Sequence, residues 1–293
     1  YLDVSYPQSQ ESIRIFCVVD LIKQIKEKKR DFDIIVLNHD LKNGMPKQLD
    51  SFSIPIIPSV HAGWFKRKKS DHFKNTKQLL EKFIADMSIQ IDSWFLSSFF
   101  SEVSNVSIQD ESDCNRLASE AESLFKRIQE KYNEHNIKQT PYIFLKDEKG
   151  TYGMGVLPIY HPEEILKLNR KARNKLSLGK SGVAIDSFLL QEGIYTNQSI
   201  NQASAESVLY FIGKHPVSTF YRYHNKKGNQ ESLNSAGMNF SNKLDNNNTP
   251  ENNLMPFLAR LARIAASQEI DALVCQSQTP FFRVFPAESF RSL

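Results

Sequence analysis

The chain has 293 residues, of which 40% are hydrophobic and 24% are charged, and its formal net charge is +4. This length allows roughly two domains, or one domain with a mobile lid, and enough apolar residues for a sizeable core. No segment approaches the ~20 apolar residues of a membrane-spanning helix, and so small a positive charge does not by itself indicate nucleic-acid binding. The sequence opens on Tyr1 with neither an initiator Met nor a signal-peptide pattern, so we expect its natural start to be missing.

Cysteine usage indicates a reducing compartment. The three cysteines are far apart and form no CxxC pair: Cys17, Cys114 and Cys275. Such an odd, sparse set argues against a disulfide framework or a zinc site and favours the cytoplasm. Cys17 falls within an apolar strand pattern, so we predict that it is a small core residue.

The first sixty residues carry a strand–helix–strand pattern. An apolar run at 13–19 predicts a buried strand, residues 21–25 follow at helical spacing, and residues 34–37 predict a second strand. This order is typical of a parallel α/β unit. A third extended segment at 54–58 contains proline, which places it at a sheet edge or a strand end.

Helices and strands alternate less regularly in the rest of the chain. The predicted elements are amphipathic helices at 76–91 and 115–134, a strand at 142–146, a polar helix at 163–176, strands at 183–191, 207–212 and 217–223, and a helix at 254–268. Residues 97–113 are rich in serine and acidic residues and indicate a loop. Residues 224–253 are polar and Asn-rich, which predicts irregular structure.

The strongest local signal is a glycine-rich loop that follows a strand. The strand at 142–146 ends on Lys146, and Gly150, Gly153 and Gly155 come next. Glycine lets backbone amides approach phosphate oxygens closely, successive amides can form an anion-binding concavity, and the lysine adds a point charge. The alternative interpretation is a hairpin turn that happens to be rich in glycine.

Two familiar nucleotide motifs are excluded. Pro158 stands where the dinucleotide-binding fingerprint requires its third glycine. The Gly-Lys-Ser at 179–181 resembles the end of a Walker loop, but Asn174 occupies the position of its first glycine. We interpret residues 178–182 as a polar turn.

A basic and aromatic cluster occupies residues 61–73. Four cations follow Trp64 and Phe65 directly: Lys66, Arg67, Lys68 and Lys69. Such a cluster can bind RNA or the α-carboxylate of an amino acid, and it can also be a solvated loop. Because it follows a strand end in a predicted α/β unit, where ligands tend to bind, we favour a substrate carboxylate or phosphate. The histidines His61, His72 and His224 lack metal-ligand spacing and are expected to be surface or hydrogen-bonding residues.

The order of these motifs resembles the ATP-grasp superfamily, and glutathione synthetase in particular. A strand ends in Gln191-Glu192, a hairpin ends on Arg222, and a loop of small residues contains Asn234. The resemblance implies that Lys146 and the 150–155 loop, including Tyr152, hold the phosphates of ATP. It also implies that Gln191 and Glu192 flank the adenine, that Arg222 stabilises the transferred phosphoryl group, and that Asn234 lies beside it.

The closer resemblance is to the ATP-grasp-like family of bacterial glutamate–cysteine ligases. The matching segments are 37–41, 63–73, 146–156, 168–175 and 220–238. The resemblance implies formation of γ-glutamylcysteine from glutamate, cysteine and ATP through an acyl phosphate. The implied substrate-binding residues are Trp64, Arg67, Lys69, Ser70 and His72. Two alternatives stay open: another carboxylate–amine ligase similar to glutathione synthetase, and an RNA-binding module that uses the Lys66–Lys69 patch.

One departure from the superfamily concerns magnesium. ATP-grasp enzymes usually place Mg²⁺ on late acidic residues, often within a Glu-x-Asn motif, and this motif is missing here. Only Glu269 and Asp271 follow the last predicted helix before Glu288. The metal ligands are therefore unassigned, and Glu206 and Glu231 are the remaining candidates.

The expected fold is α/β and ATP-grasp-like. We predict an N-terminal parallel α/β domain at 1–110, a lid at 111–190, and a C-terminal antiparallel-sheet part at 191–293. The implied cofactors are ATP and Mg²⁺, and the implied partners are small-molecule substrates. We expect neither nucleic acid nor membrane as a partner, and a homo-oligomer stays open.

Overall fold

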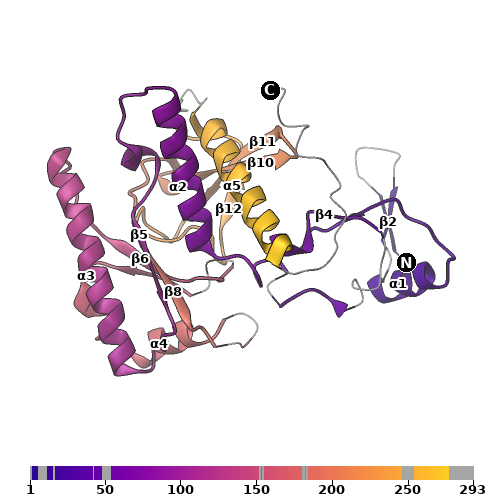
Figure 1. Ribbon diagram of the computed structural model, residues 1–293, viewed down its shortest axis with the longest axis horizontal. Helices are drawn as coiled ribbons and strands as arrows, with labels where there is room; N and C mark the ends of the chain where they lie inside the picture. The colour runs from indigo at the N-terminus through magenta and orange to yellow at the C-terminus, as the bar shows by residue number, and fades with distance from the viewer. Residues whose placement is uncertain are drawn as a thin grey trace.

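Two four-stranded antiparallel sheets form the body of the protein (Figure 1). The computed structural model describes residues 2–5, 12–15, 17–41, 43–47, 54–151, 153, 155–179, 182, 184–245 and 254–276. The first sheet has the order β5 (Phe100–Ser104), β8 (Ser187–Glu192), β6 (Ile143–Asp147) and β7 (Val156–Ile159). The second has the order β12 (Asn239–Ser241), β11 (His215–Tyr223), β10 (Ala203–Ile212) and β9 (Ser199–Ile200).

Helix α3 (Glu111–Glu134) covers one face of the first sheet and forms the main core with it. Leu117, Ala121, Leu124 and Ile128 recur at helical spacing and are fully buried. The carboxylate of Asp110 begins the helix by accepting a hydrogen bond from the amide of Asp113 at 2.9 Å. The predicted helix at 115–134 and its apolar face are therefore confirmed.

The pleat of β6 decides which side chains reach the other face of this sheet. Ile143 and Leu145 are fully buried in the core beneath α3. Phe144 and Lys146 alternate with them and therefore point to the opposite face. This alternation places Lys146 between the two sheets.

Two shorter helices follow β7 along the edge of the first sheet. They are the 3₁₀ helix η4 (Pro162–Glu164) and α4 (Arg170–Ser177). The predicted polar helix at 163–176 thus corresponds to two separate segments. Asn169 begins α4, because its side chain accepts a hydrogen bond from the amide of Ala172 at 2.9 Å.

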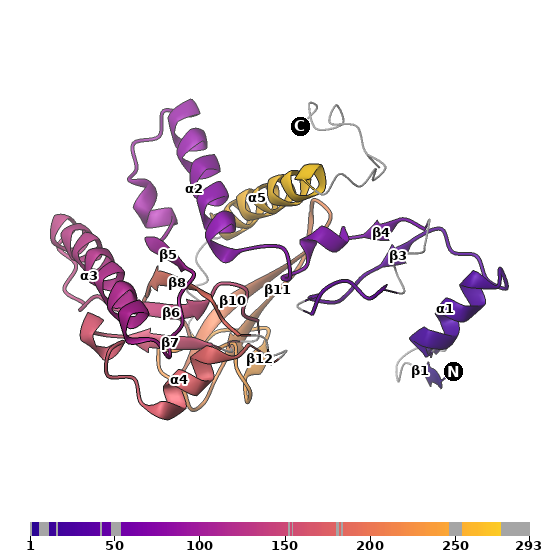
Figure 2. The same ribbon diagram turned by 60° about the horizontal axis from the view of Figure 1, so that its bottom comes forward.

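Helices α2 (Lys69–Asp86) and α5 (Leu254–Gln276) run side by side, as both views show (Figure 1, Figure 2). Phe83 and Phe257 join them with ring centroids 4.7 Å apart. The helix predicted at 76–91 begins seven residues earlier than expected, and Met87 beyond its end is exposed. The last helix extends past its predicted end at 268. None of the described helices is long and apolar enough to cross a membrane.

The N-terminal elements differ from the predicted parallel unit. β1 (Leu2–Ser5) and β2 (Ser12–Ile15) form an antiparallel pair, α1 (Val18–Lys26) follows, and β3 (Ile35–Val36) pairs in parallel with β4 (Ile56–Ile57). The prediction of one strand at 13–19 was wrong, because β2 ends at Ile15 and α1 begins three residues later. Cys17 precedes α1 as its N-cap and is exposed, so it is not a core residue.

The segment predicted as a loop at 97–113 contains β5, an edge strand of the first sheet. The polar residues of this segment gave no apolar pattern from which a strand could be predicted. Glu102 of β5 is partly buried because its carboxylate binds Lys68 at 2.8 Å and Ser70 Oγ at 3.0 Å. β5 pairs with β8 and so joins residues on both sides of the predicted boundary at 110. The three-part division itself stays a prediction.

The irregular segment predicted at 224–253 holds one short strand, β12, and is otherwise mainly turns and bends up to residue 245. Residues 246–253 lie outside the described part of the chain.

Truncation of the α3 core should destabilise the fold. Because Leu124 is fully buried, we expect Leu124→Ala to lower the free energy of unfolding by about 2–5 kcal/mol through lost burial and a cavity. Chemical denaturation followed by circular dichroism measures the change. Lys126→Ala, on the exposed face of the same helix, should stay within about 0.5 kcal/mol of the unmodified protein. Equal stability of the two variants would contradict the assigned helix face.

Candidate functional site

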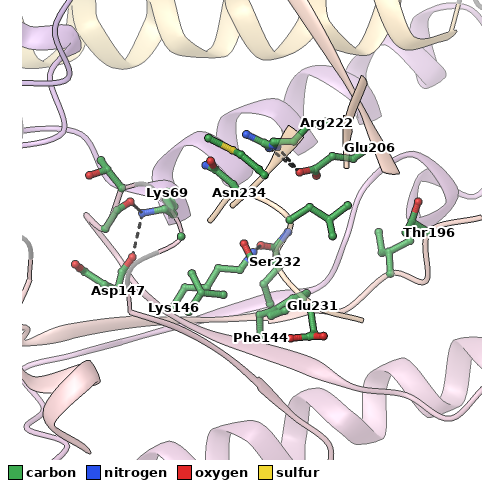
Figure 3. A pocket seen from close by; sticks show the side chains of 18 of the residues that line it. Lys69, Phe144, Lys146, Asp147, Thr196, Glu206, Arg222, Glu231, Ser232 and Asn234 are labelled. Carbon is green, nitrogen blue, oxygen red and sulfur yellow. Dashed lines mark hydrogen bonds and ion pairs between the residues drawn. The ribbon is translucent and has the colours of Figure 1, made fainter. Parts of the chain in front are cut away.

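A pocket with a volume of about 750 Å³ lies between the two sheets. This volume is typical of a small-molecule site. The residues that line it come from distant parts of the chain and include Asp40, Trp64, Lys69, His72, Lys146, Gly150, Gly153, Gln191, Glu206, Arg222, Glu231 and Asn234. Figure 3 shows Arg222 and Glu206 on one side of the pocket, Lys146 and Phe144 on the other, and Ser232 and Asn234 between them.

Lys146 places a partly buried cation in this pocket. Its ammonium donates a hydrogen bond to Gln191 Oε1 at 2.7 Å and lies 4.8 Å from the centroid of the Phe144 ring. Burial and, to a smaller extent, the charge of Lys69 lower the pKa of Lys146 to about 8, and the charge of Glu206 partly opposes this change. An anion bound beside Lys146 would offset the free-energy cost of burying the charge of its ammonium.

The first turn of α2 and the loop after β6 are locked together by two reciprocal contacts. Lys69 Nζ donates to the backbone carbonyls of Asp147, Glu148 and Gly150 at 3.0, 3.0 and 2.7 Å. In return, Glu148 Oε1 accepts a hydrogen bond from the amide of Ser70 at 2.6 Å. The α2 N-terminus has no side-chain cap of its own, so Glu148 satisfies an otherwise unpaired helix amide and complements the helix dipole.

The glycine-rich loop passes very close to the loop that holds Asn234. Gly153 has a φ of +66°, and a Cβ at this position would lie 2.0 Å from the backbone oxygen of Asn234. Gly155 has a φ of +65°. These two positions require glycine for backbone conformation, and Gly153 also requires it for space. The predicted contact residue Tyr152 lies outside the described residues.

Arg222 and Glu206 form the wall of the pocket opposite Lys146 and Phe144 (Figure 3). They are directly paired across the antiparallel β10–β11 hairpin, and Arg222 Nη2 lies 2.6 Å from Glu206 Oε1. Both side chains line the pocket together with Lys146 and Gly153. Arg222 therefore lies on the pocket side of the hairpin, and the ion pair fixes the guanidinium at the pocket surface.

The predicted substrate-binding cluster separates into pocket residues and supporting residues. Trp64, Lys69 and His72 line the pocket, whereas Arg67 and Ser70 are not among its lining residues. The Arg67 guanidinium lies 5.1 Å from the centroid of the Trp64 ring and binds the carboxylate of Glu269. Ser70 is completely buried. The positions of Arg67 and Ser70 follow from α2, whose first turn begins inside this motif.

Of the predicted Gln-Glu pair, only Gln191 reaches the pocket. Successive residues of β8 point to opposite faces, so Glu192 is buried on the other side. Its carboxylate accepts hydrogen bonds from Trp94 Nε1 at 3.0 Å and from the amide of Phe99 at 2.9 Å. Burial raises the pKa of Glu192 above its ordinary value, and these hydrogen bonds oppose the rise. Glu192 therefore supports the fold, which corrects the side-chain role predicted for it.

Carboxylates that could hold a divalent cation line the pocket. Glu206 is paired with Arg222, and Glu231 accepts a hydrogen bond from the amide of Gly228 at 2.9 Å. Asp147 also lines the pocket. Carboxylate oxygens of this kind suit Mg²⁺, which is commonly bound by one or two carboxylates together with substrate phosphates. The donor set therefore fits Mg²⁺ only in combination with such a ligand.

A second acidic group lies outside the pocket. Among the described residues, Asp92, Glu134 and His135 converge closely enough to suggest a metal site. However, Lys131 Nζ already lies 2.5 Å from Asp92 and 2.8 Å from Glu134. The lysine supplies the positive charge that a metal ion would bring, so the group is an ion-pair cluster.

Sequence reasoning missed Glu269 as part of the site. This buried residue of α5 binds His72 at the pocket wall, where Glu269 Oε1 lies 2.7 Å from His72 Nδ1. The sequence separates the two by 197 positions. Glu269 follows the predicted end of the last helix at 268, and no local pattern indicated this contact.

Comparison with known proteins gives the family. A model of the family described as glutamate-cysteine ligase matches residues 4–270. The chain belongs to the glutamate–cysteine ligase family. A solved structure from Methylobacillus flagellatus KT, assigned as a gamma-glutamylcysteine synthetase, has 30% sequence identity with the chain and a TM-score of 0.69. The alignment covers 86% of this chain and 61% of the other. No curated protein matches the chain. The resemblance inferred from the sequence motifs is thus confirmed at the level of the family.

Adding a side chain at Gly153 should displace the glycine-rich loop. Because a Cβ there would overlap the backbone oxygen of Asn234, we expect Gly153→Ala to open the loop and to speed amide hydrogen exchange across residues 147–156. Gly213→Ala is the matched control, since Gly213 has a φ of +56° but open space around it. Both variants carry left-handed strain, so equal exchange in this loop would show that the close approach is unimportant.

Proposed function

We propose that this protein joins the γ-carboxylate of glutamate to the amine of cysteine, using ATP and an acyl phosphate intermediate. One observation carries the proposal: a single pocket brings together Lys146, the glycine-rich loop and Arg222. These are the cationic and backbone groups that phosphoryl transfer requires. Membership of the glutamate–cysteine ligase family supports the choice of substrates.

The architecture supports an ATP-grasp-like nucleotide site. The pocket lies between two antiparallel sheets, with Lys146 and the glycine-rich loop at one end for the phosphates. In this proposal Gln191, which lies beside Lys146, meets the adenine base. Glu206 and Glu231 would hold Mg²⁺, which would neutralise charge on the phosphates when bound. The need for ATP also fits the cytoplasmic location expected from the cysteines.

In the proposed reaction, the glutamate γ-carboxylate attacks the γ-phosphorus of ATP, and ADP leaves. The cysteine amine then attacks the acyl carbon, and phosphate leaves. Arg222 meets the phosphoryl group as its charge is redistributed, while Lys146 holds the phosphates in place. Trp64 and His72, which also line the pocket, contact the amino-acid substrates in this proposal.

Lys69 acts differently from a substrate clamp in this proposal. Its ammonium is directed to three backbone carbonyls of the loop. We therefore assign it to organising the phosphate-binding loop. The glutamate and cysteine carboxylates are left to other groups at the pocket wall.

The RNA-binding alternative loses its main support. Arg67 binds Glu269, Lys68 binds Glu102, and Lys69 binds the loop after β6. Three of the four cations that suggested an RNA surface are thus engaged within the protein. A ligase with another amine substrate, similar to glutathione synthetase, is distinguished by experiment.

The direct test measures ADP formation from ATP and Mg²⁺ with glutamate and each of the twenty amino acids in turn. We expect ADP formation to depend on glutamate and to be fastest with cysteine, with a γ-linked dipeptide detected by mass spectrometry. Faster turnover with a different amine would replace cysteine as the substrate. Absence of any glutamate-dependent ADP formation would overturn the proposed function.

ATP affinity should fall as the pH rises through the pKa of Lys146. With a pKa of about 8, the charged fraction of Lys146 drops from about nine-tenths at pH 7 to about one-tenth at pH 9, so Kd should rise roughly tenfold. Isothermal titration calorimetry measures this and should show proton uptake on binding near pH 8. Lys146→Arg should bind ATP with little change over this range, because arginine stays charged.

Replacing Lys146 with an uncharged side chain of similar length tests how much its charge contributes to ATP binding. Lys146→Met should weaken ATP binding by about 1–3 kcal/mol, the usual range for a charge-assisted contact. Unchanged affinity in a folded Lys146→Met protein would remove Lys146 from the phosphate site.

Removal of Arg222 should reduce the rate more than the affinity for ATP. An interaction that strengthens in the transition state lowers kcat when lost, and we expect Arg222→Ala to lose about 10²-fold in kcat. Steady-state kinetics with saturating glutamate and cysteine provides the measurement. The control is Arg116→Ala, which removes an exposed arginine paired with Asp113 on α3 and should keep full activity. A kcat within twofold of the unmodified enzyme would show that Arg222 serves only its ion pair with Glu206.

A further inference from the structure

Glu269 is a buried carboxylate of α5 that binds Arg67 and His72, two residues of the basic and aromatic segment at the pocket. Glu269 is 6% exposed, and its two oxygens have separate partners. Oε2 accepts a hydrogen bond from Arg67 Nε at 2.9 Å, and Oε1 lies 2.7 Å from His72 Nδ1. The side-by-side packing of α2 and α5 brings these groups together (Figure 2).

The two contacts hold Glu269 in its charged form. Burial alone would raise the pKa of Glu269, but the hydrogen bond from His72 and the charge of Arg67 keep it below its ordinary value. Arginine stays protonated throughout the physiological range. Arg67 therefore balances the carboxylate permanently, and His72 need not be charged to satisfy it.

This arrangement decides which nitrogen of His72 is available to a ligand. Arg67 Nη2 also lies 3.4 Å from Nδ1, but the carboxylate at 2.7 Å is the closer partner and requires the proton on that nitrogen. The lone pair of a neutral imidazole therefore lies on Nε2. His72 lines the pocket, and none of the described residues makes a hydrogen bond to its Nε2. A carboxylate–histidine pair of this kind orients a base and stabilises the imidazolium that forms when it accepts a proton.

We propose that His72 Nε2 accepts the proton of the attacking amine and that Glu269 positions His72 for this step. The inference rests on the proposed function. The cysteine amine arrives as an ammonium ion and must lose a proton before it has a lone pair. In the step, that proton moves to Nε2, the nitrogen attacks the acyl carbon, the C–N bond forms, and the C–O bond to phosphate breaks. Phosphate leaves with the electron pair, and solvent removes the protons from His72 and the new amide.

The alternative role for His72 is a cationic clamp for the α-carboxylate of cysteine. One observation favours the base. Arg67 already neutralises the charge of Glu269, so His72 is not needed as the counter-charge of this carboxylate. The other charged groups that line the pocket near His72 are Lys69, whose ammonium binds the loop carbonyls, and Asp40.

The test compares three acceptors in the unmodified enzyme and in His72→Gln. Cysteine and cysteamine both present an ammonium ion, but cysteamine lacks the carboxylate. Hydroxylamine is largely uncharged at neutral pH and traps the acyl phosphate as a hydroxamate without needing a base. We expect His72→Gln to lose at least about 10²-fold in kcat with cysteine and cysteamine, and to keep hydroxamate formation within about threefold.

Two further variants sharpen the interpretation. Glu269→Gln should lower kcat with cysteine about tenfold or more and leave hydroxamate formation intact, as expected for a positioning residue. The acid limb of the kcat–pH profile for cysteamine should disappear in His72→Gln. His161→Gln removes an exposed histidine that is not among the residues lining the pocket and should change none of these rates.

Each outcome decides the matter. Loss with cysteine alone, mainly as a higher KM, would identify a carboxylate clamp and overturn the proposal. Equal loss with all three acceptors would assign His72 to structure or to phosphoryl transfer, and unchanged rates would also overturn it. If the unmodified enzyme forms neither dipeptide nor hydroxamate, both the proposed function and the role of His72 fail. Normal hydroxamate formation in every variant would show that the acyl phosphate still forms, so the role of His72 is then tested separately from the proposed function.

Discussion

The reciprocal lock between α2 and the loop after β6 is the constraint on which the pocket depends. Lys69 holds three loop carbonyls, and Glu148 of the same loop holds the amide of Ser70. Each partner satisfies polar groups that the other leaves unpaired, since a helix start exposes amides and a tight turn exposes carbonyls. The lock joins the basic–aromatic segment and the glycine-rich loop, which are about 80 positions apart, into one wall.

The other walls follow from strand geometry. Alternation along β6 sends Lys146 away from the α3 core, and alternation along β8 separates Gln191 from Glu192. Across the pocket, pairing of β10 with β11 places Glu206 beside Arg222 and keeps the guanidinium at the surface. The pocket thus combines fixed cations on two sheets with one loop that passes against Asn234. Such fixed charges suit a reaction in which charge moves between phosphate and carboxylate groups, because little reorganisation is needed.

The helix pair α2–α5 adds a second layer to the site. Trp64 and His72 line the pocket, whereas Arg67 and Glu269 do not line it but contact Trp64 and His72. The buried carboxylate would be costly without its two partners. Its presence therefore ties the orientation of His72 to the packing of α5, so the last described helix contributes to the site without lining it.

The sequence by itself determined the elements whose signals are local. Helical spacing identified α3 and its buried face, the apolar runs identified β6, β8, β10 and β11, and the strand–lysine–glycine order identified Lys146 and its loop. The same motifs were sufficient for the family. Local patterns failed where a polar strand was stabilised by distant partners, as in β5 with Glu102, and where an apolar run was divided between β2 and α1.

Only the tertiary structure decided which of the candidate side chains meet. Arg67, Ser70 and Glu192 carry the right chemistry for a site, yet each side chain is bound by a partner that does not line the pocket. Glu269 has no local signal, and it enters because α5 packs against α2 at a separation of nearly two hundred residues. The physical reason is that hydrophobic periodicity and turn chemistry act over a few residues. The pairing of charges in a low-dielectric interior depends on which elements pack together, and that is decided by the whole fold.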